Sequence, residues 1–157
     1  MPRHLQATPS GDGLRIGVAL ARFNQSVTDL LLAGTVEALT AHGVADDAID
    51  IATVPGAFEL PLCAQRMAST GRYDALVCLG AVVRGETPHF DFIAAEAARG
   101  IADVARRHDL PVAFGVLTAD TIEQALARAG GARGNKGYDA AITALEMVQV
   151  LRAVHRF

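Results

Sequence analysis

The sequence is poor in aromatic residues and has no excess of basic charge. Only 5% of its 157 residues are Phe, Trp or Tyr, and Trp is absent. The 14 basic and 17 acidic residues give a net charge of −3. This balance argues against a polyanion-binding surface, so we expect no nucleic-acid partner.

Long apolar runs are also absent. No run approaches the roughly 18 residues that a membrane-spanning helix needs. Residues 1–15 contain no hydrophobic core of a signal peptide. We therefore expect a cytoplasmic protein with no membrane partner.

Motifs for metals and common nucleotide cofactors are missing as well. The only two cysteines, Cys63 and Cys78, lie in apolar stretches and read as buried thiols of a reducing compartment. No regular spacing of metal ligands occurs, and no Gly-x-Gly-x-x-Gly follows the first apolar run. Residues 134–137 (GNKG) lack the Gly-Lys-Ser/Thr of a triphosphate loop. We expect neither a metal nor a nucleotide cofactor.

What the chain has instead is aliphatic residues. Hydrophobic residues make up 51% of the sequence, and the mean hydropathy is +0.27, which is high for a small monomer. A mass of 16.4 kDa fits one domain. We expect part of the apolar surface to be covered by another subunit.

Apolar runs alternate with helical periodicity along the chain, which predicts an α/β fold: a three-layer sandwich with a central four-stranded parallel sheet flanked by helices. Residues 1–13 are expected to form a flexible arm and residues 14–157 a single domain. The third helix is expected to turn Phe92, Ile93, Ile101, Val104 and Ala105 inward. A glycine-rich link is expected over residues 130–137. Strands are predicted over residues 14–20, 49–54, 74–83 and 111–117, and helices over 25–42, 59–69, 89–108, 121–129 and from 138 onward.

Parallel sheets of this kind bind ligands beyond the carboxyl ends of their strands. Phe23 follows the first strand there, either as a hydrophobic staple on the next helix or as a flat face for a planar ligand. Asn24 beside it offers an amide. Residues 55–57 form either a tight turn or a place where a ligand lies close to the backbone. Glu59 in the next helical turn suits the helix dipole whether or not it binds a ligand.

The segment after the third strand has the composition of an anion site. Residues 84–87 place backbone N–H groups and a hydroxyl at a positive helix N-terminus, although many such turns bind nothing. His89 is the one histidine of five expected at this rim. The positive helix end favours its neutral imidazole, as either a capping group or a proton carrier.

Taken together and in order, several segments resemble the lumazine synthase family of the riboflavin pathway, whose fold is flavodoxin-like. They cover nearly the whole chain from about residue 14, and the longest is highly specific. The matching segments are residues 22–24 (RFN), 54–61 (VPGAFELP), 80–91 (GAVVRGETPHFD), 114–118 (FGVLT) and 134–137 (GNKG).

The resemblance implies a transferase that condenses 5-amino-6-(D-ribitylamino)uracil with 3,4-dihydroxy-2-butanone 4-phosphate to 6,7-dimethyl-8-ribityllumazine, without a cofactor or metal. It implies that His89 carries protons. The residues it implies for the phosphate are Gly85, Glu86, Thr87 and Arg128. The residues it implies for the pyrimidine and its ribityl chain are Phe23, Asn24, Gly56, Ala57, Phe58, Glu59, Ala81, Val82, Val83, Phe114 and Lys136.

The resemblance also implies self-association, with active sites between subunits. Phe114 and Arg128 would come from a neighbouring subunit in a pentamer, a decamer or a sixty-subunit shell, and riboflavin synthase would be a partner. Three alternatives stay open at this point. They are a flavin-binding carrier or storage module on a flavodoxin-like sheet, a shell protein with a vestigial site, and an archaeal-type riboflavin synthase.

Overall fold

Four parallel strands form the central sheet of the computed structural model, which describes all 157 residues. In chain order they are β1 (Ile16–Ala21), β2 (Ile49–Val54), β3 (Ala75–Val83) and β4 (Val112–Ala119). Their order across the sheet is β2-β1-β3-β4. The predicted parallel four-stranded sheet is therefore confirmed, with β1 and β3 in the centre.

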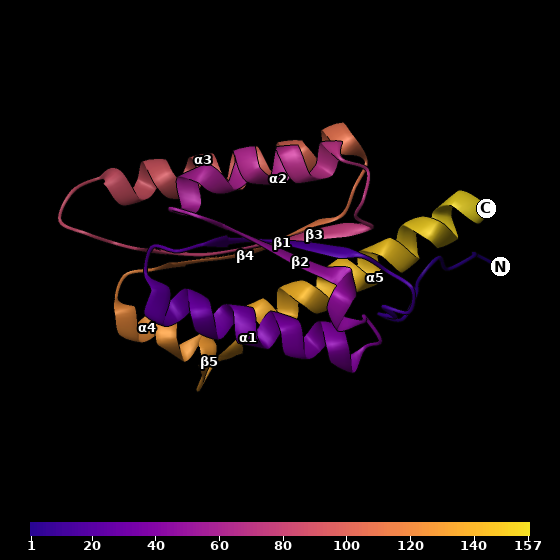
Figure 1. The fold of residues 1–157 in the computed structure, drawn as a ribbon, viewed down its shortest axis with the longest axis horizontal. Helices are drawn as coiled ribbons and strands as arrows, with labels where there is room; N and C mark the ends of the chain where they lie inside the picture. Colours follow the sequence, from indigo (N-terminus) through magenta and orange to yellow (C-terminus); the bar gives the residue numbers. More distant parts are fainter.

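Helices cover both faces of the sheet (Figure 1). On one face lie α1 (Gln25–Ala41), α4 (Ile122–Ala127) and α5 (Lys136–Arg156). On the other lie α2 (Leu60–Ser69) and α3 (His89–His108). Two single 3-10 turns, Asp46–Ala48 and Ala57–Glu59, flank β2. None of the helices has both the length and the apolar character needed to cross a bilayer.

Strand β1 is buried at all six positions, as expected for a strand covered on both faces. Ile16, Val18 and Leu20 join a cluster of 23 buried residues under α1 and α5. Ala19 and Ala21 point the other way, into a cluster of 12 under α2 and α3. The alternation of large and small side chains thus divides the core into two layers.

One expectation for α3 is wrong. Ile101 and Val104 are buried as predicted, but Phe92 is 66% exposed. Nine residues separate Phe92 from Ile101, and at about 100° per residue this places them on opposite faces of the helix. Ile93, one residue further along, is half-buried against the core.

The glycine-rich link is more ordered than the sequence indicates. It contains a short antiparallel hairpin of β5 (Ala129–Gly131) and β6 (Gly134–Asn135), and α5 already begins at Lys136. Asn135 caps α5, because its Oδ1 accepts hydrogen bonds from the N–H groups of Gly137 at 2.8 Å and Tyr138 at 3.1 Å. Its Nδ2 donates to the carbonyl of Leu30 in α1 at 3.1 Å.

Gly137 lets α1 and α5 approach closely. A Cβ there would clash with the backbone carbonyl of Leu31, so only glycine fits. The hydroxyl of Thr35 donates to the Gly137 carbonyl at 2.9 Å across the same contact. The GNKG segment therefore supplies a helix cap and a close helix contact.

The N-terminal segment contains no helix or strand before Ile16. It lies beside the end of α5, where Gln149 Nε2 donates to the carbonyl of Ser10 at 2.9 Å. The guanidinium of Arg3 lies over the ring of Phe157 at 4.6 Å from its centroid. The flexibility expected of residues 1–13 stays a prediction.

Candidate active site

A pocket of about 640 Å³ opens at the carboxyl edge of the sheet. Its volume is in the range of small-molecule sites, and its place is where sheets of this kind bind ligands. Its walls come from the segments after β1, β2 and β3 and from the first turns of α3. The lining residues are Phe23, Asn24, Gly56, Ala57, Phe58, Glu59, Ala81, Val82, Val83, Gly85, Thr87, His89, Phe90 and Ile93.

Asn24 sets the shape of the pocket at the end of β1. It adopts the left-handed conformation, with φ of 62°, and its carbonyl accepts hydrogen bonds from Val27 and Thr28 in the first turn of α1. Its Nδ2 donates to the carbonyl of Ala81 at 2.8 Å. One side-chain donor of Asn24 thus ties the end of β1 to β3 and is not free for a ligand.

Phe23 is 70% exposed and lines the pocket. Such exposure does not fit a hydrophobic staple packed on α1. It leaves the ring available to stack on a planar ligand, which was the other interpretation of this residue. The N–H of Phe23 donates to the carbonyl of Pro55 at 3.0 Å, which places the ring next to the turn after β2.

The turn after β2 presents small residues to the pocket. A Cβ on Gly56 would lie 3.3 Å from Oε1 of Glu59, so the carboxylate lies directly beside the bare backbone. Glu59 directly precedes α2, where the helix dipole favours a negative charge. A ligand in the pocket can therefore meet a carboxylate and backbone groups at one wall.

The segment before α3, which was predicted as an anion site, borders the pocket. Gly85 and Thr87 line the pocket, and His89 is the first residue of α3 and is exposed. The N–H of His89 donates to Oγ1 of Thr87 in a long hydrogen bond of 3.4 Å. Glu86 in the same turn is exposed but does not line the pocket.

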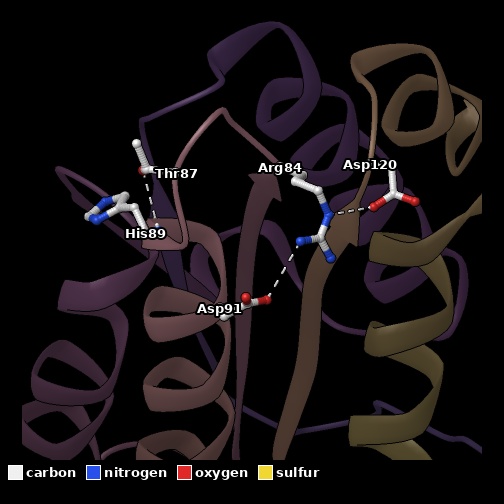
Figure 2. A network of polar contacts seen from close by, with 5 residues as sticks. All are labelled: Arg84, Thr87, His89, Asp91 and Asp120. Carbon is white, nitrogen blue, oxygen red and sulfur yellow. Dashed lines mark hydrogen bonds and ion pairs between the residues drawn. The ribbon is translucent and has the colours of Figure 1, made fainter.

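Arg84 holds the opposite side of this turn (Figure 2). Its Nε donates to Oδ1 of Asp120 at 2.8 Å, and its Nη1 lies 3.8 Å from Oδ1 of Asp91. The hydrogen bond to Asp120 raises the pKa of the guanidinium further above its usual range. In Figure 2 the His89 ring lies on the other side of the α3 start from Arg84.

A second cavity, of about 430 Å³, lies between β4 and the start of α5. Arg128, Arg133 and Lys136 give it three cationic groups against the single carboxylate of Asp139. The Arg128 Nη1 donates to the carbonyl of Gln124 at 3.0 Å, which holds the side chain at the end of α4. This cavity has the charge expected of an anion site.

The structure thus divides the predicted site residues into three groups. Twelve of the sixteen line the first pocket. Arg128 and Lys136 line the second cavity, while Phe114 on β4 and Glu86 line neither. Sequence reasoning missed Phe90 and Ile93 in the first pocket. The spacing of His89 and Ile93 by four residues on one helix is the signal that indicates a shared face.

Comparison with known proteins identifies close relatives of this chain. Residues 13–152 match the family model described as 6,7-dimethyl-8-ribityllumazine synthase. A 6,7-dimethyl-8-ribityllumazine synthase of Desulfatibacillum aliphaticivorans is 55% identical over 150 residues, which are 96% of this chain and 97% of the relative.

Proposed function

Since the chain belongs to the 6,7-dimethyl-8-ribityllumazine synthase family and has that family's activity in riboflavin biosynthesis, we propose that the pocket at the carboxyl edge is its active site and that a second subunit completes it. The reaction condenses 5-amino-6-(D-ribitylamino)uracil with 3,4-dihydroxy-2-butanone 4-phosphate, releasing phosphate and water. Binding two substrates side by side supplies much of the acceleration.

The pyrimidine binds on the β1 and β2 side of the pocket. Phe23 stacks on its ring, a role supported by the exposure of the phenyl face. Glu59 accepts hydrogen bonds from ribityl hydroxyls. The polar groups that hold the ring edge and the chain are contributed by Asn24, Gly56, Ala57, Phe58, Ala81, Val82 and Val83.

The phosphate binds at the start of α3. Backbone N–H groups around Gly85 and Glu86 and the hydroxyl of Thr87 donate to it at the positive end of the helix. The Thr87 hydroxyl retains its proton for this, since it acts as the acceptor in the contact with His89. An arginine is the fitting fourth partner because it grips phosphate bidentately and keeps its charge.

His89 moves the protons. Imine formation, phosphate elimination and ring closure each transfer protons near neutral pH, which suits an imidazole. The ring is exposed beside the phosphate turn and on the same pocket wall as Phe90 and Ile93. A proton acceptor at this place lies within reach of both substrates.

The single observation that carries the two-subunit site is the separation of its parts. The pocket with His89 contains no lysine or arginine, whereas Arg128 and Lys136 line a different cavity of the same chain. We infer that Phe114, Arg128 and Lys136 of one subunit complete the pocket of the next. Leu62 and Phe92, which are both about two-thirds exposed, support self-association into pentamers or larger shells.

Mixing two impaired variants tests this arrangement when the phosphorylated substrate is kept well below the KM of Arg128→Ala. His89→Ala and Arg128→Ala each damage every site of their own assembly. In mixed assemblies formed by co-expression, a site with His89 from one subunit and Arg128 from the other is intact, and random pairing makes about a quarter of sites intact. Fluorescent lumazine formation should recover to that level. The control is a chain that carries both substitutions and is expressed alone. Every site of its assembly lacks both His89 and Arg128, so no activity should recover.

No recovery in verified mixed assemblies would contradict the shared site. Absence of lumazine formation by the unaltered protein, above the uncatalysed background, would contradict the assignment of the active site as a whole.

A further inference from the structure

We propose that Arg84 is a positioning residue of the reaction, which braces the start of α3 so that His89 and Thr87 stay in place, and that it is not a ligand of the phosphate. The proposal rests on the proposed function of the pocket. Arg84 is the first residue of the proposed phosphate-binding turn (residues 84–87), so its sequence position alone indicates a phosphate ligand. Its contacts indicate a different role.

The guanidinium of Arg84 is already committed on three sides. Nε donates to Asp120 at 2.8 Å, and Nη1 lies 3.8 Å from Asp91. Its central carbon lies 4.5 Å from the centroid of the Phe90 ring, a cation–π contact. Arg84 itself does not line the pocket. The Nε and Nη1 groups and one face of the guanidinium are thus engaged by protein groups outside the lining of that pocket.

Asp120, which accepts the hydrogen bond from Arg84, is itself held in place. The N–H of Asp120 donates to Oε1 of Gln124 at 2.8 Å, and Oγ1 of Thr121 caps α4 by accepting from the Gln124 N–H at 3.1 Å. The N–H of Arg84 donates to the carbonyl of Ala119 at 2.8 Å, which continues the pairing of β3 with β4. The guanidinium therefore joins the ends of two strands.

The other two contacts of Arg84 reach the first turn of α3. Phe90 and Asp91 are the second and third residues of α3, directly after His89. Phe90 also lines the pocket, so Arg84 contacts a ring that forms part of the pocket wall. A bond between Arg84 and Asp120 thus fixes the first turn of α3 against the sheet.

Arginine is suited to this brace and lysine is not. Both carboxylates are about two-thirds exposed, and an exposed ion pair by itself contributes little to stability. The planar guanidinium can stack on Phe90 while its edge bonds to Asp120, whereas an ammonium cannot do both. The effect of Arg84 should therefore appear in turnover rather than in stability.

Steady-state kinetics of Arg84→Lys, Asp120→Ala and the double variant separate the two roles. For a brace, both single variants should lower kcat about tenfold, with the KM for the phosphorylated substrate changed less than about twofold. The double variant should be no worse than Arg84→Lys, because both changes break one contact. Arg99→Lys, in an exposed pair with Glu96 on the same helix, is the matched control and should retain full activity.

A phosphate ligand would behave differently. Asp120→Ala would then free Arg84 and keep or lower the KM for the phosphorylated substrate without loss of kcat, and Arg84→Lys would raise that KM. This result, or full activity of both single variants, would overturn the brace. Circular dichroism and mass in solution show whether each variant is folded and assembled, and Asp120→Glu, which keeps the carboxylate, should recover part of the lost turnover.

Including His89→Ala in the series keeps the two proposals apart. Loss of turnover in His89→Ala with normal turnover in the Arg84 and Asp120 variants would overturn the brace alone. Normal turnover in His89→Ala would remove His89 from the proposed mechanism whatever the Arg84 and Asp120 variants show.

Discussion

Asn135 should stabilise the fold mainly as the cap of α5, and replacing it with alanine tests this. The Oδ1 atom satisfies two N–H groups at the helix start, those of Gly137 and Tyr138. Loss of a side-chain cap costs about 1 kcal/mol, with a range of roughly 0.5–2 kcal/mol. The Nδ2 bond to Leu30 is solvent-exposed, and its loss adds about 0.5 kcal/mol.

The free energy of unfolding of Asn135→Ala should therefore fall by about 1–2 kcal/mol. For a chain of this size that corresponds to a midpoint of thermal unfolding about 3–6 °C lower. Urea and thermal unfolding followed by circular dichroism measure both quantities. All variants are compared at one protein concentration, because the proposed self-association would contribute to apparent stability.

Asn135→Asp is the matched variant. It keeps the capping oxygen and adds a charge that the helix N-terminus favours by about 0.3–1 kcal/mol, which offsets the replacement of the donor to Leu30 by an oxygen that the Leu30 carbonyl repels. We expect its stability within about 0.5 kcal/mol of the original protein. If Asn135→Asp were as unstable as Asn135→Ala, the bond between α1 and α5 and not the cap would hold the helix start, and the reasoning would be refuted.

Three further predictions concern the site and the core. Arg128→Ala should raise the KM for the phosphorylated substrate at least tenfold, because a charged hydrogen-bond partner is lost, while the affinity for the pyrimidine stays the same; equal loss of both, measured by steady-state kinetics and titration, would speak against the phosphate role. His89→Ala should lower kcat about 10²–10⁴-fold with pyrimidine affinity retained, and unchanged turnover would remove His89 from the mechanism. Burial raises the pKa of the Cys78 thiol to about 12, so above about pH 9 the unfolded chain releases a proton that the folded chain keeps. The free energy of unfolding should then fall with rising pH, by up to about 1.4 kcal/mol per unit until about pH 12, and urea titrations of Cys78→Ala should show a shallower slope; an unchanged slope would exclude the thiol as its cause.

Much of the fold follows from the chain because its patterns are strong. The run around β3 is apolar at every position and is buried almost throughout, so no alternative structure competes with a central strand. The hairpin of β5 and β6 was not predicted, because two- and three-residue strands carry no periodicity. Phe92 was misplaced because its apolar character alone was taken to point it inward, although a position nine residues from Ile101 lies on the opposite face of the helix.

The pocket was predictable because the segments that follow β1, β2 and β3 meet at one edge of the sheet within a single chain. Phe23, Glu59 and His89 come together because β1, β2 and β3 end at the same edge of the sheet. The brace of Arg84 was not predicted, because Asp120 lies 36 residues away and its pairing depends on the β3–β4 register. The choice between a synthase and a flavin carrier came from family comparison, since both activities suit this fold.

The separation of the two cavities within one chain has a kinetic consequence. Folding of an isolated chain builds the sheet and the first pocket but, on the proposed arrangement, no complete site. After dilution from denaturant, helical signal should return at a rate independent of protein concentration, whereas synthase activity should lag and return faster as concentration rises. A freshly folded subunit would therefore be inactive until it associates with another copy of the chain.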